Sequence, residues 1–219
     1  MTRLNSIGQC NLCKKTVSGT AMSKHLESCE ERKKANENEI KQNRIFLLRA
    51  SAGPFFVYFE IDESLALKNI DNFLRHLWLE CCGHLSAFTI RGISYSLHPQ
   101  SEYEDRSMNI PVKHILKSGL EFKHEYDFGT TTELNMKCIS ERQGEHRKEI
   151  DILSRNNMPE FNCDKCGKPA KEICQECIGM GEEGLFCESC AKENEHDEEM
   201  FLPVVNSPRM GMCGYTGND

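Results

Sequence analysis

The stretch RIFLLRASAGPFFVYFEI, residues 44–61, contains two apolar runs on either side of a short turn-forming segment. Residues 44–50 and 54–61 are rich in β-branched and aromatic side chains, and Ser-Ala-Gly-Pro lies between the two runs. This pattern predicts two strands joined in a hairpin. We expect the hairpin to open a central domain that spans about residues 43–143.

Beyond the hairpin, the periodicity of the apolar residues changes to that of a helix and then back to that of strands. Residues 67–82 place apolar side chains on one helical face, and these are Ile70, Phe73, Leu74, Leu77 and Trp78. Residues 84–97 alternate as a strand whose phase changes at Gly92, which indicates a bulge or bend. Residues 120–128 and 131–140 alternate as a second hairpin around Asp-Phe-Gly-Thr. These elements predict an α+β fold, with a helix packed on a central antiparallel sheet.

The N-terminal region carries a pattern typical of a zinc finger. Cys10 and Cys13 form a Cys-x2-Cys pair, and His25 and Cys29 follow four residues apart, on the same side of an expected helix. Three thiolates and one imidazole would complete a tetrahedral shell. We expect residues 1–42 to form this finger of three cysteines and one histidine, with a charged helical extension. The basic triplet at 32–34 in that extension could contact phosphate, although a solvated face is the favoured interpretation.

The C-terminal region, residues 161–219, repeats the Cys-x2-Cys pair three times. Counting single residues as well, it holds eight candidate ligands, enough for two four-ligand sites: Cys163, Cys166, Cys174, Cys177, Cys187, Cys190, His196 and Cys213. Consecutive pairs can share an ion, which is the sequential arrangement, or alternate pairs can share one, which is the crosswise arrangement. We favour a cross-brace in which one zinc ion is bound by Cys163, Cys166, Cys187 and Cys190 and the other by Cys174, Cys177, His196 and Cys213. Glycines after Cys166 and Cys213 would allow the positive φ that turns backbone N–H groups toward the sulfur.

Three cysteines and two further polar residues remain outside these sites. Cys81, Cys82 and Cys138 are expected to be small apolar residues rather than a reactive pair. His84 and Asp127 lie near expected strand ends, where a structural hydrogen bond is the favoured role. The acidic segment at 195–200 is expected to be a solvated loop, and residues 144–160 a linker that is partly helical. The only cofactor predicted is therefore zinc, as three structural ions.

Composition limits the compartment and the partners. No apolar run approaches the roughly 20 residues that span a bilayer, and the first ten residues lack the apolar core of a secretory signal. We therefore expect a cytoplasmic protein without a membrane partner, in which paired cysteines indicate metal. The net charge is +5 over residues 1–50, −4 over 51–150 and −8 over 151–219. Only the first segment has the charge to bind a polyanion.

The central region resembles the plasmid Orf-three-like family, which is also described after a passenger protein of an insertion element. The resemblance covers about residues 43–143 and rests on FFVYFEI, LWLECCGHLSAFTI and EFKHEYDFG. Many members continue the last motif as Asp-x-Trp-x-His, whereas Thr130, Thr132 and Leu134 stand at those positions here. The resemblance implies a compact α+β domain and no established activity. The C-terminal spacing is similar to cross-brace zinc modules of the MYND type, which bind peptides, but the long gap before Cys213 departs from them.

Two classes of function follow from these patterns. The first is a non-enzymatic, zinc-binding adaptor whose basic finger contacts nucleic acid or a nucleoprotein and whose C-terminal module contacts protein. The alternative is an enzyme with its site in the central domain and the zinc modules as scaffold. No Gly-rich phosphate loop or dinucleotide motif is present, so no small-molecule cofactor is predicted. A cleft lined by titratable groups would favour the enzyme, and a continuous basic face would favour nucleic-acid binding: Lys14, Lys15, Lys24, Arg32, Lys33 and Lys34.

Overall fold

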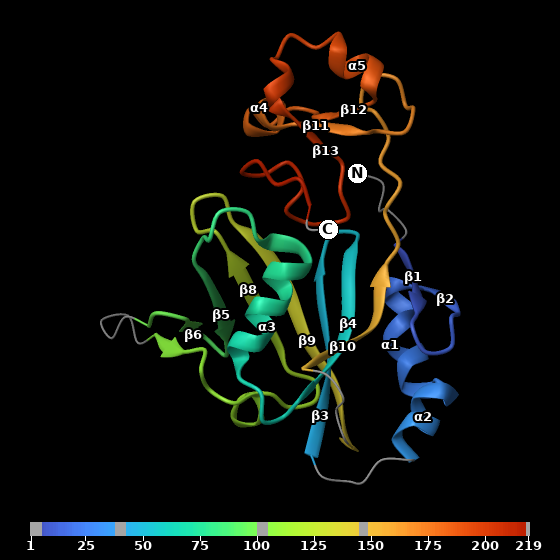
Figure 1. Ribbon diagram of the computed structural model, residues 1–219, viewed down its shortest axis with the longest axis vertical. Helices are drawn as coiled ribbons and strands as arrows, with labels where there is room; N and C mark the ends of the chain where they lie inside the picture. The colour runs from blue at the N-terminus through green and yellow to red at the C-terminus, as the bar shows by residue number, and fades with distance from the viewer. Residues whose placement is uncertain (1–5, 38–42, 100–104, 145–148, 218–219) are drawn as a thin grey trace.

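The computed structural model describes residues 6–37, 43–99, 105–144 and 149–217, and it confirms an α+β protein built on a large antiparallel sheet. Ten strands form this sheet in the order β2-β1-β10-β4-β3-β9-β8-β5-β6-β7 (Figure 1). Every pairing is antiparallel except that of β6 with β7. A separate three-stranded sheet, β12-β11-β13, forms the C-terminal module.

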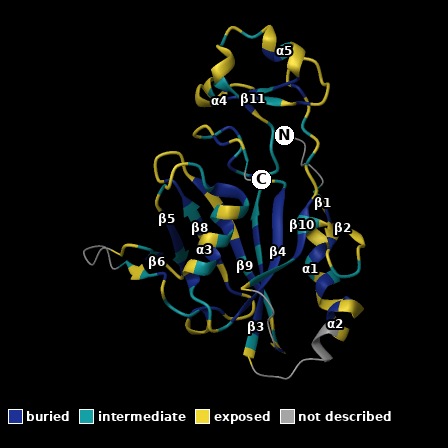
Figure 2. Ribbon diagram, viewed as in Figure 1, coloured by how far each residue is buried: buried dark blue, intermediate teal, exposed yellow. Residues whose placement is uncertain are grey.

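The predicted hairpin is the middle of the large sheet. It consists of β3 (Asn43–Ala52) and β4 (Phe55–Asp62), which pair over their whole length. Every residue of β4 is buried because both faces of the strand are covered. On one face, Phe59 packs with the apolar side of α3 (Leu67–Leu74), and on the other, Tyr58 packs with residues of α1 (Gly19–Ser28). Figure 2 shows the buried residues concentrated in these central strands.

The helix and strand patterns of the central domain are also confirmed, with two local differences. The helix widens into a single π turn at Arg75–Leu79 before it ends, and Trp78 remains fully buried. The phase change at Gly92 is a complete chain reversal between β5 (Ser86–Ile90) and β6 (Ile93–Ser96). Arg91 and Gly92 both have positive φ, as the tight turns of hairpins require. The second hairpin pairs β8 (Glu121–Tyr126) with β9 (Thr132–Gly144).

The expected linker at 144–160 contains a strand of the large sheet instead. β10 (Ile150–Asn156) pairs with β4 on one side and with β1 (Ile7–Cys10) on the other. Residues 145–148 and the expected boundary at residue 42 lie outside the described residues. Because β1 and β2 (Thr16–Ser18) continue the sheet beyond β10, the finger is joined to the central domain by backbone hydrogen bonds. α2 (Glu30–Glu37) is the predicted charged helical extension.

The remaining elements are short. The central domain also contains β7 (Arg106–Ser107) and a 3-10 turn at Val112–His114. The C-terminal module contains β11 (Glu172–Cys174), α4 (Gln175–Gly179), β12 (Leu185–Phe186), α5 (Glu188–Lys192), a 3-10 turn at Glu198–Met200, and β13 (Phe201–Pro203). After β13, the tail, residues 204–217, returns to the space between the module and the large sheet (Figure 1). In the part of the chain that the structure describes, no helix has the length and apolarity to cross a bilayer.

Candidate metal centres

Four groups of cysteine and histidine side chains bring their ligand atoms within 4.8 Å of one another, so four clusters could hold metal ions. We call them the finger cluster (Cys10, Cys13, His25, Cys29), the four-cysteine cluster (Cys163, Cys166, Cys187, Cys190), the three-ligand cluster (Cys174, Cys177, His196) and the junction cluster (Cys81, Cys82, His84, Cys213). All thirteen cysteines are free thiols. Soft sulfur with imidazole is a donor set that suits zinc.

The finger cluster forms where β1 ends and α1 packs against the sheet. Cys10 is the last residue of β1, and the chain turns back so that Cys10 N–H donates to the Lys15 carbonyl at 2.9 Å. His25 Nε2 lies 3.3 Å from Cys13 Sγ. Cys29 caps the C-terminal end of α1 and is 5% exposed. The four residues that meet here are those that the sequence spacing predicts.

The four-cysteine cluster has the crosswise arrangement. Cys166 Sγ lies 3.6 Å from Cys187 Sγ, although the two residues belong to different Cys-x2-Cys pairs. Gly167 has the positive φ that was expected after Cys166, and its N–H donates to the Cys163 carbonyl. The pairs at 163–166 and 187–190 are held next to each other because Asp164 N–H donates to the Leu185 carbonyl at 2.8 Å and Leu185 N–H donates to an Asp164 carboxylate oxygen at 2.7 Å.

The three-ligand cluster uses one nitrogen of its histidine. His196 Nδ1 lies 3.2 Å from Cys174 Sγ and 3.4 Å from Cys177 Sγ. The other ring nitrogen, Nε2, is 4.0 Å from a carboxylate oxygen of Glu176. No fourth cysteine, histidine or carboxylate among the described residues comes within 4.8 Å of all three ligand atoms. A tetrahedral ion here would have one position left for another donor.

The place expected for Cys213 has to be corrected, since it lies in the junction cluster and not with His196. Its sulfur is 3.3 Å from His84 Nε2 and 3.8 Å from Cys82 Sγ. The physical reason is the path of the tail, which is fastened to the central domain by the buried Arg209. The guanidinium of Arg209 donates to an Asp127 carboxylate oxygen at 2.5 Å and to the Thr130 carbonyl at 2.6 Å.

The junction cluster was missed by sequence reasoning. Cys81 is half-buried and Cys82 is exposed, so neither is the buried apolar residue expected. The sequence held one signal, Cys-Cys-x-His at 81–84, but the spacing to Cys213 gives no hint of the fourth ligand. Cys138 does behave as expected: it is fully buried on β9, and this burial raises the pKa of its thiol to about 12.

The central domain contains a buried polar network next to the junction cluster. Asp71 Oδ1 accepts a hydrogen bond from Ser86 Oγ at 2.7 Å and lies 2.7 Å from His124 Nε2. Burial would raise the pKa of Asp71, but the hydrogen bonds and the positive charge of Arg75 outweigh it and hold the pKa below its usual range. Asp71 and His124 are fully buried and Ser86 is 4% exposed, so these groups bond one another inside the fold. This arrangement fixes α3 on the sheet.

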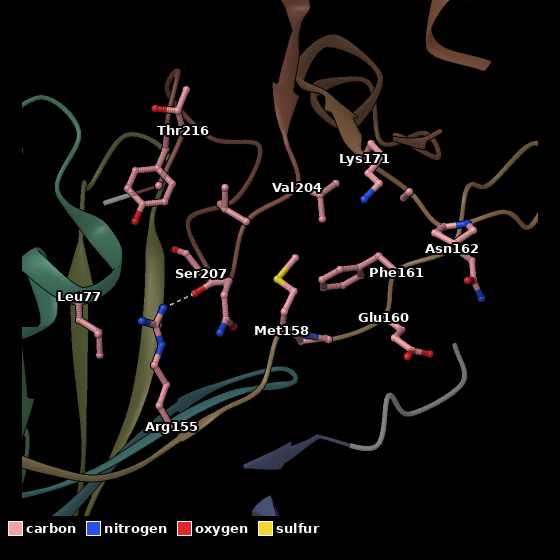
Figure 3. Close-up of a pocket in the computed structure, with 17 residues that line it drawn as sticks. Leu77, Arg155, Met158, Glu160, Phe161, Asn162, Lys171, Val204, Ser207 and Thr216 are labelled. Carbon is pink, nitrogen blue, oxygen red and sulfur yellow. Dashed lines mark hydrogen bonds between the residues drawn. The ribbon is translucent and has the colours of Figure 1, made fainter. Parts of the chain in front are cut away.

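Among the hollows on or beside the C-terminal module, one lies next to the tail and another next to the three-ligand cluster. The first, of about 680 Å³, separates the module from the large sheet, and Figure 3 shows Met158, Phe161 and Val204 around it. Arg155 on β10 reaches across this space to the Asn206 carbonyl, at 2.7 Å. The other hollow, of about 650 Å³, is lined by Cys177, His196 and carboxylates of the module. None of the residues of the Asp71 network lines either of them.

Comparison with known proteins identifies no family. No family model matches the chain, and no curated protein matches it. The resemblances to the plasmid Orf-three-like family and to MYND modules are therefore not supported. Among solved structures, the chain is similar to a protein of unknown function, MM3350 from Methanosarcina mazei Go1. The two share 11% identity over 72% of this chain and 85% of that chain, with a TM-score of 0.45, too low to bear on function.

Proposed function

We propose that the protein is a non-enzymatic interaction protein, an adaptor whose parts are held in shape by structural zinc ions. The observation that carries the proposal is the placement of the four clusters. Each cluster joins separate segments of the chain, and the C-terminal module has only a small apolar core of its own. A module of this kind needs its metal to fold. The free thiols favour a reducing compartment, the cytoplasm.

The surface of the C-terminal module favours a basic protein segment as its partner. The 650 Å³ hollow is lined by five carboxylates, which are Asp164, Glu182, Glu183, Glu193 and Glu195. Only one lysine, Lys165, lines it with them. A concentration of one sign of charge in a hollow raises the local concentration of ligands of the opposite sign. Lysine- or arginine-rich peptide is the chemistry that this surface would attract.

The finger offers less to nucleic acid than the sequence suggested. Arg32 is 8% exposed because its guanidinium is bound to Glu60, and Lys34 pairs with Glu31. The exposed basic side chains that remain from the expected face are Lys14, Lys15, Lys24, Lys33 and the paired Lys34. Binding of RNA or DNA through residues 1–42 stays a proposal of lower weight. A gel-shift assay over a salt series tests it, because phosphate contacts weaken steeply as salt rises.

The test of the main proposal begins with elemental analysis of the purified protein. We expect zinc, with at least three ions per chain, and loss of the module's folded structure when a strong chelator removes them. Fewer than three ions, or a different metal, would overturn the structural assignment.

Partner binding is then measured with a fluorescent lysine-rich peptide by anisotropy. We expect affinity that falls with salt and is lost in the Glu183→Lys, Glu193→Lys double variant. The matched control is Glu27→Lys, Glu30→Lys on the finger, which makes the same change in net charge away from the hollow. Equal loss in both variants would show that only net charge matters, and no binding by the natural protein would remove the basic segment as a partner class.

A second candidate function rests on the three-ligand cluster. Two cysteines, one histidine and one open position are a donor set found in catalytic zinc sites, and here Cys177 and His196 line the acidic hollow. A metal ion in this cluster could bind water or a ligand at its open position. Cobalt substitution tests this, because azide or imidazole shifts the visible bands of an open cobalt site. We expect the shift in the natural protein and its absence in His196→Ala. No shift in the natural protein would show that the shell is closed.

A further inference from the structure

We propose that the junction cluster binds its own zinc ion, and that this ion acts as a releasable clasp between the tail and the central domain. Cys81, Cys82 and His84 come from the segment that follows the α3 helix, and Cys213 comes from the tail. The ion would be a fourth, beyond the three that the sequence predicts. Its loss would leave the tail held to the central domain chiefly by Arg209 and so loosen it, without unfolding the large sheet.

The distances match those of a tetrahedral site. Zinc–sulfur bonds of about 2.3 Å place two sulfur ligands roughly 3.8 Å apart and a sulfur and a nitrogen ligand somewhat closer. Cys82 Sγ and Cys213 Sγ are 3.8 Å apart, and His84 Nε2 is 3.3 Å from Cys213 Sγ. A disulfide requires sulfur atoms about 2.05 Å apart. The separation is therefore that of two ligands of one ion.

The backbone on both sides of the cluster is shaped to bring the ligands together. Gly83, between Cys82 and His84, has φ +72°, which lets the chain fold back so that three ligands from four residues meet. Cys213 itself has φ +50° and is followed by Gly214 at +66°. A residue with a Cβ seldom adopts this conformation unless its surroundings hold it there. A metal bond to Cys213 Sγ would supply that hold.

The groups around the ligands are those that support a metal site. His84 directs Nε2 at the cluster, and its Nδ1 lies 3.6 Å from an Asp127 carboxylate oxygen. A carboxylate behind a ligating histidine orients the ring and increases its basicity. Arg209 Nη2 lies 3.6 Å from Cys81 Sγ and binds the same Asp127 at 2.5 Å. Its charge offsets the negative charge of three thiolates around a divalent ion.

A metal ion in the junction cluster would also affect the contact between the C-terminal module and the central domain. Gly214 N–H donates to Gln175 Oε1 at 3.0 Å, and Gln175 lies on α4 between two ligands of the three-ligand cluster. The tail thus contacts the module on one side and the central domain on the other. Releasing Cys213 would loosen the contact between the two.

Exposure separates this cluster from the others. None of its four ligands is buried, whereas each of the other three clusters contains at least one ligand that is at most 3% exposed: Cys10, Cys163 and Cys174. A chelator or an oxidant therefore reaches the junction cluster first. We infer that its zinc exchanges faster than the other ions, which makes the clasp responsive to zinc supply and to oxidation.

The test counts zinc and follows the tail in the full chain. We expect four zinc ions in the natural protein, three in Cys213→Ser and in His84→Ala, and four again in His84→Cys, which restores a sulfur donor. The matched control is Cys138→Ala, which removes a cysteine outside the clusters and should keep four. In a chelator-competition experiment, one ion of the natural protein should leave at least 10-fold faster than the rest, and Cys213→Ser should lack that phase.

The second readout is trypsin cleavage after Arg209, which is fully buried in the closed tail. We expect cleavage at this bond to be at least 10-fold faster in Cys213→Ser and in natural protein stripped of its fast zinc, with far-UV circular dichroism unchanged. Three zinc ions in the natural protein, or an equal count in Cys213→Ser, would overturn the clasp. The structural-zinc proposal would survive that result, since it requires only the three ions of the other clusters.

Discussion

Replacing Arg32 by alanine is expected to destabilise the protein although the residue lies on a highly charged helix. The guanidinium donates to Glu60 Oε1 from Nε at 3.0 Å and from Nη2 at 2.6 Å. Arg142 approaches the same carboxylate, at 3.0 Å and 2.7 Å. Glu60 is 3% exposed on β4, so this network ties α2 of the finger to the middle of the sheet.

The size of the effect follows from what each variant leaves behind. Arg32→Ala removes two hydrogen bonds to Glu60 and one to the Leu26 carbonyl but leaves Glu60 paired with Arg142, so we expect a loss of about 2–3 kcal/mol. Glu60→Ala removes the carboxylate that pairs with the buried guanidinium of Arg32 and the half-buried one of Arg142, and the loss should reach about 3–5 kcal/mol. Lys33→Ala, the exposed neighbour, should stay within about 0.5 kcal/mol of the natural protein.

Urea unfolding followed by the fluorescence of Trp78, the one tryptophan, measures these differences. Free zinc is held constant because metal binding contributes to stability. Burial would raise the pKa of Glu60, but Arg142 and Arg32 outweigh it and hold the pKa below its usual range. The stabilisation is therefore complete above the unfolded pKa of about 4.3 and disappears as pH falls through the lowered folded value. The loss in Arg32→Ala should be constant between pH 6 and 8. If Arg32→Ala lost no more stability than Lys33→Ala, the stabilising role of the buried Arg32–Glu60 pair would be refuted.

Three further predictions concern packing and metal. Gly8→Ala would place a Cβ 2.5 Å from a backbone carbonyl of β10, so we expect a loss of about 1–3 kcal/mol; Gly179→Ala, which meets no atom within 4 Å, should cost less than about 0.5 kcal/mol in the same urea titration. Leu26→Ala, fully buried between α1 and the sheet, should lower stability by about 2–4 kcal/mol, whereas Leu85→Ala, 62% exposed, should not. After chelation, the amides of β11, β12 and β13 should lose their protection from hydrogen exchange, while those of β3, β4 and β9 stay protected. Simultaneous loss of protection in both sheets would contradict independent folding of the large sheet.

Most of the central domain could be predicted because its signals are local. The alternation in 120–128 and the apolar face of 67–82 depend on residues a few positions apart, and the turns at 53–54 and 127–131 are short. β10 escaped prediction for the opposite reason. Its seven residues hold three large apolar side chains, and the strand is defined by its neighbours β4 and β1, which lie far earlier in the chain.

For the metal centres too, the local features could be predicted from the sequence and the long-range ones could not. Local spacing is enough to predict pairs of soft ligands, because the tight turn of a Cys-x2-Cys motif brings both of its sulfur atoms within reach of one metal ion. Which pairs meet depends on the complete fold. Cys213 joins Cys82 rather than His196 because the buried Arg209 binds Asp127 and thereby directs the tail back to the central domain. That contact links residues 82 positions apart, and no local spacing could reveal it.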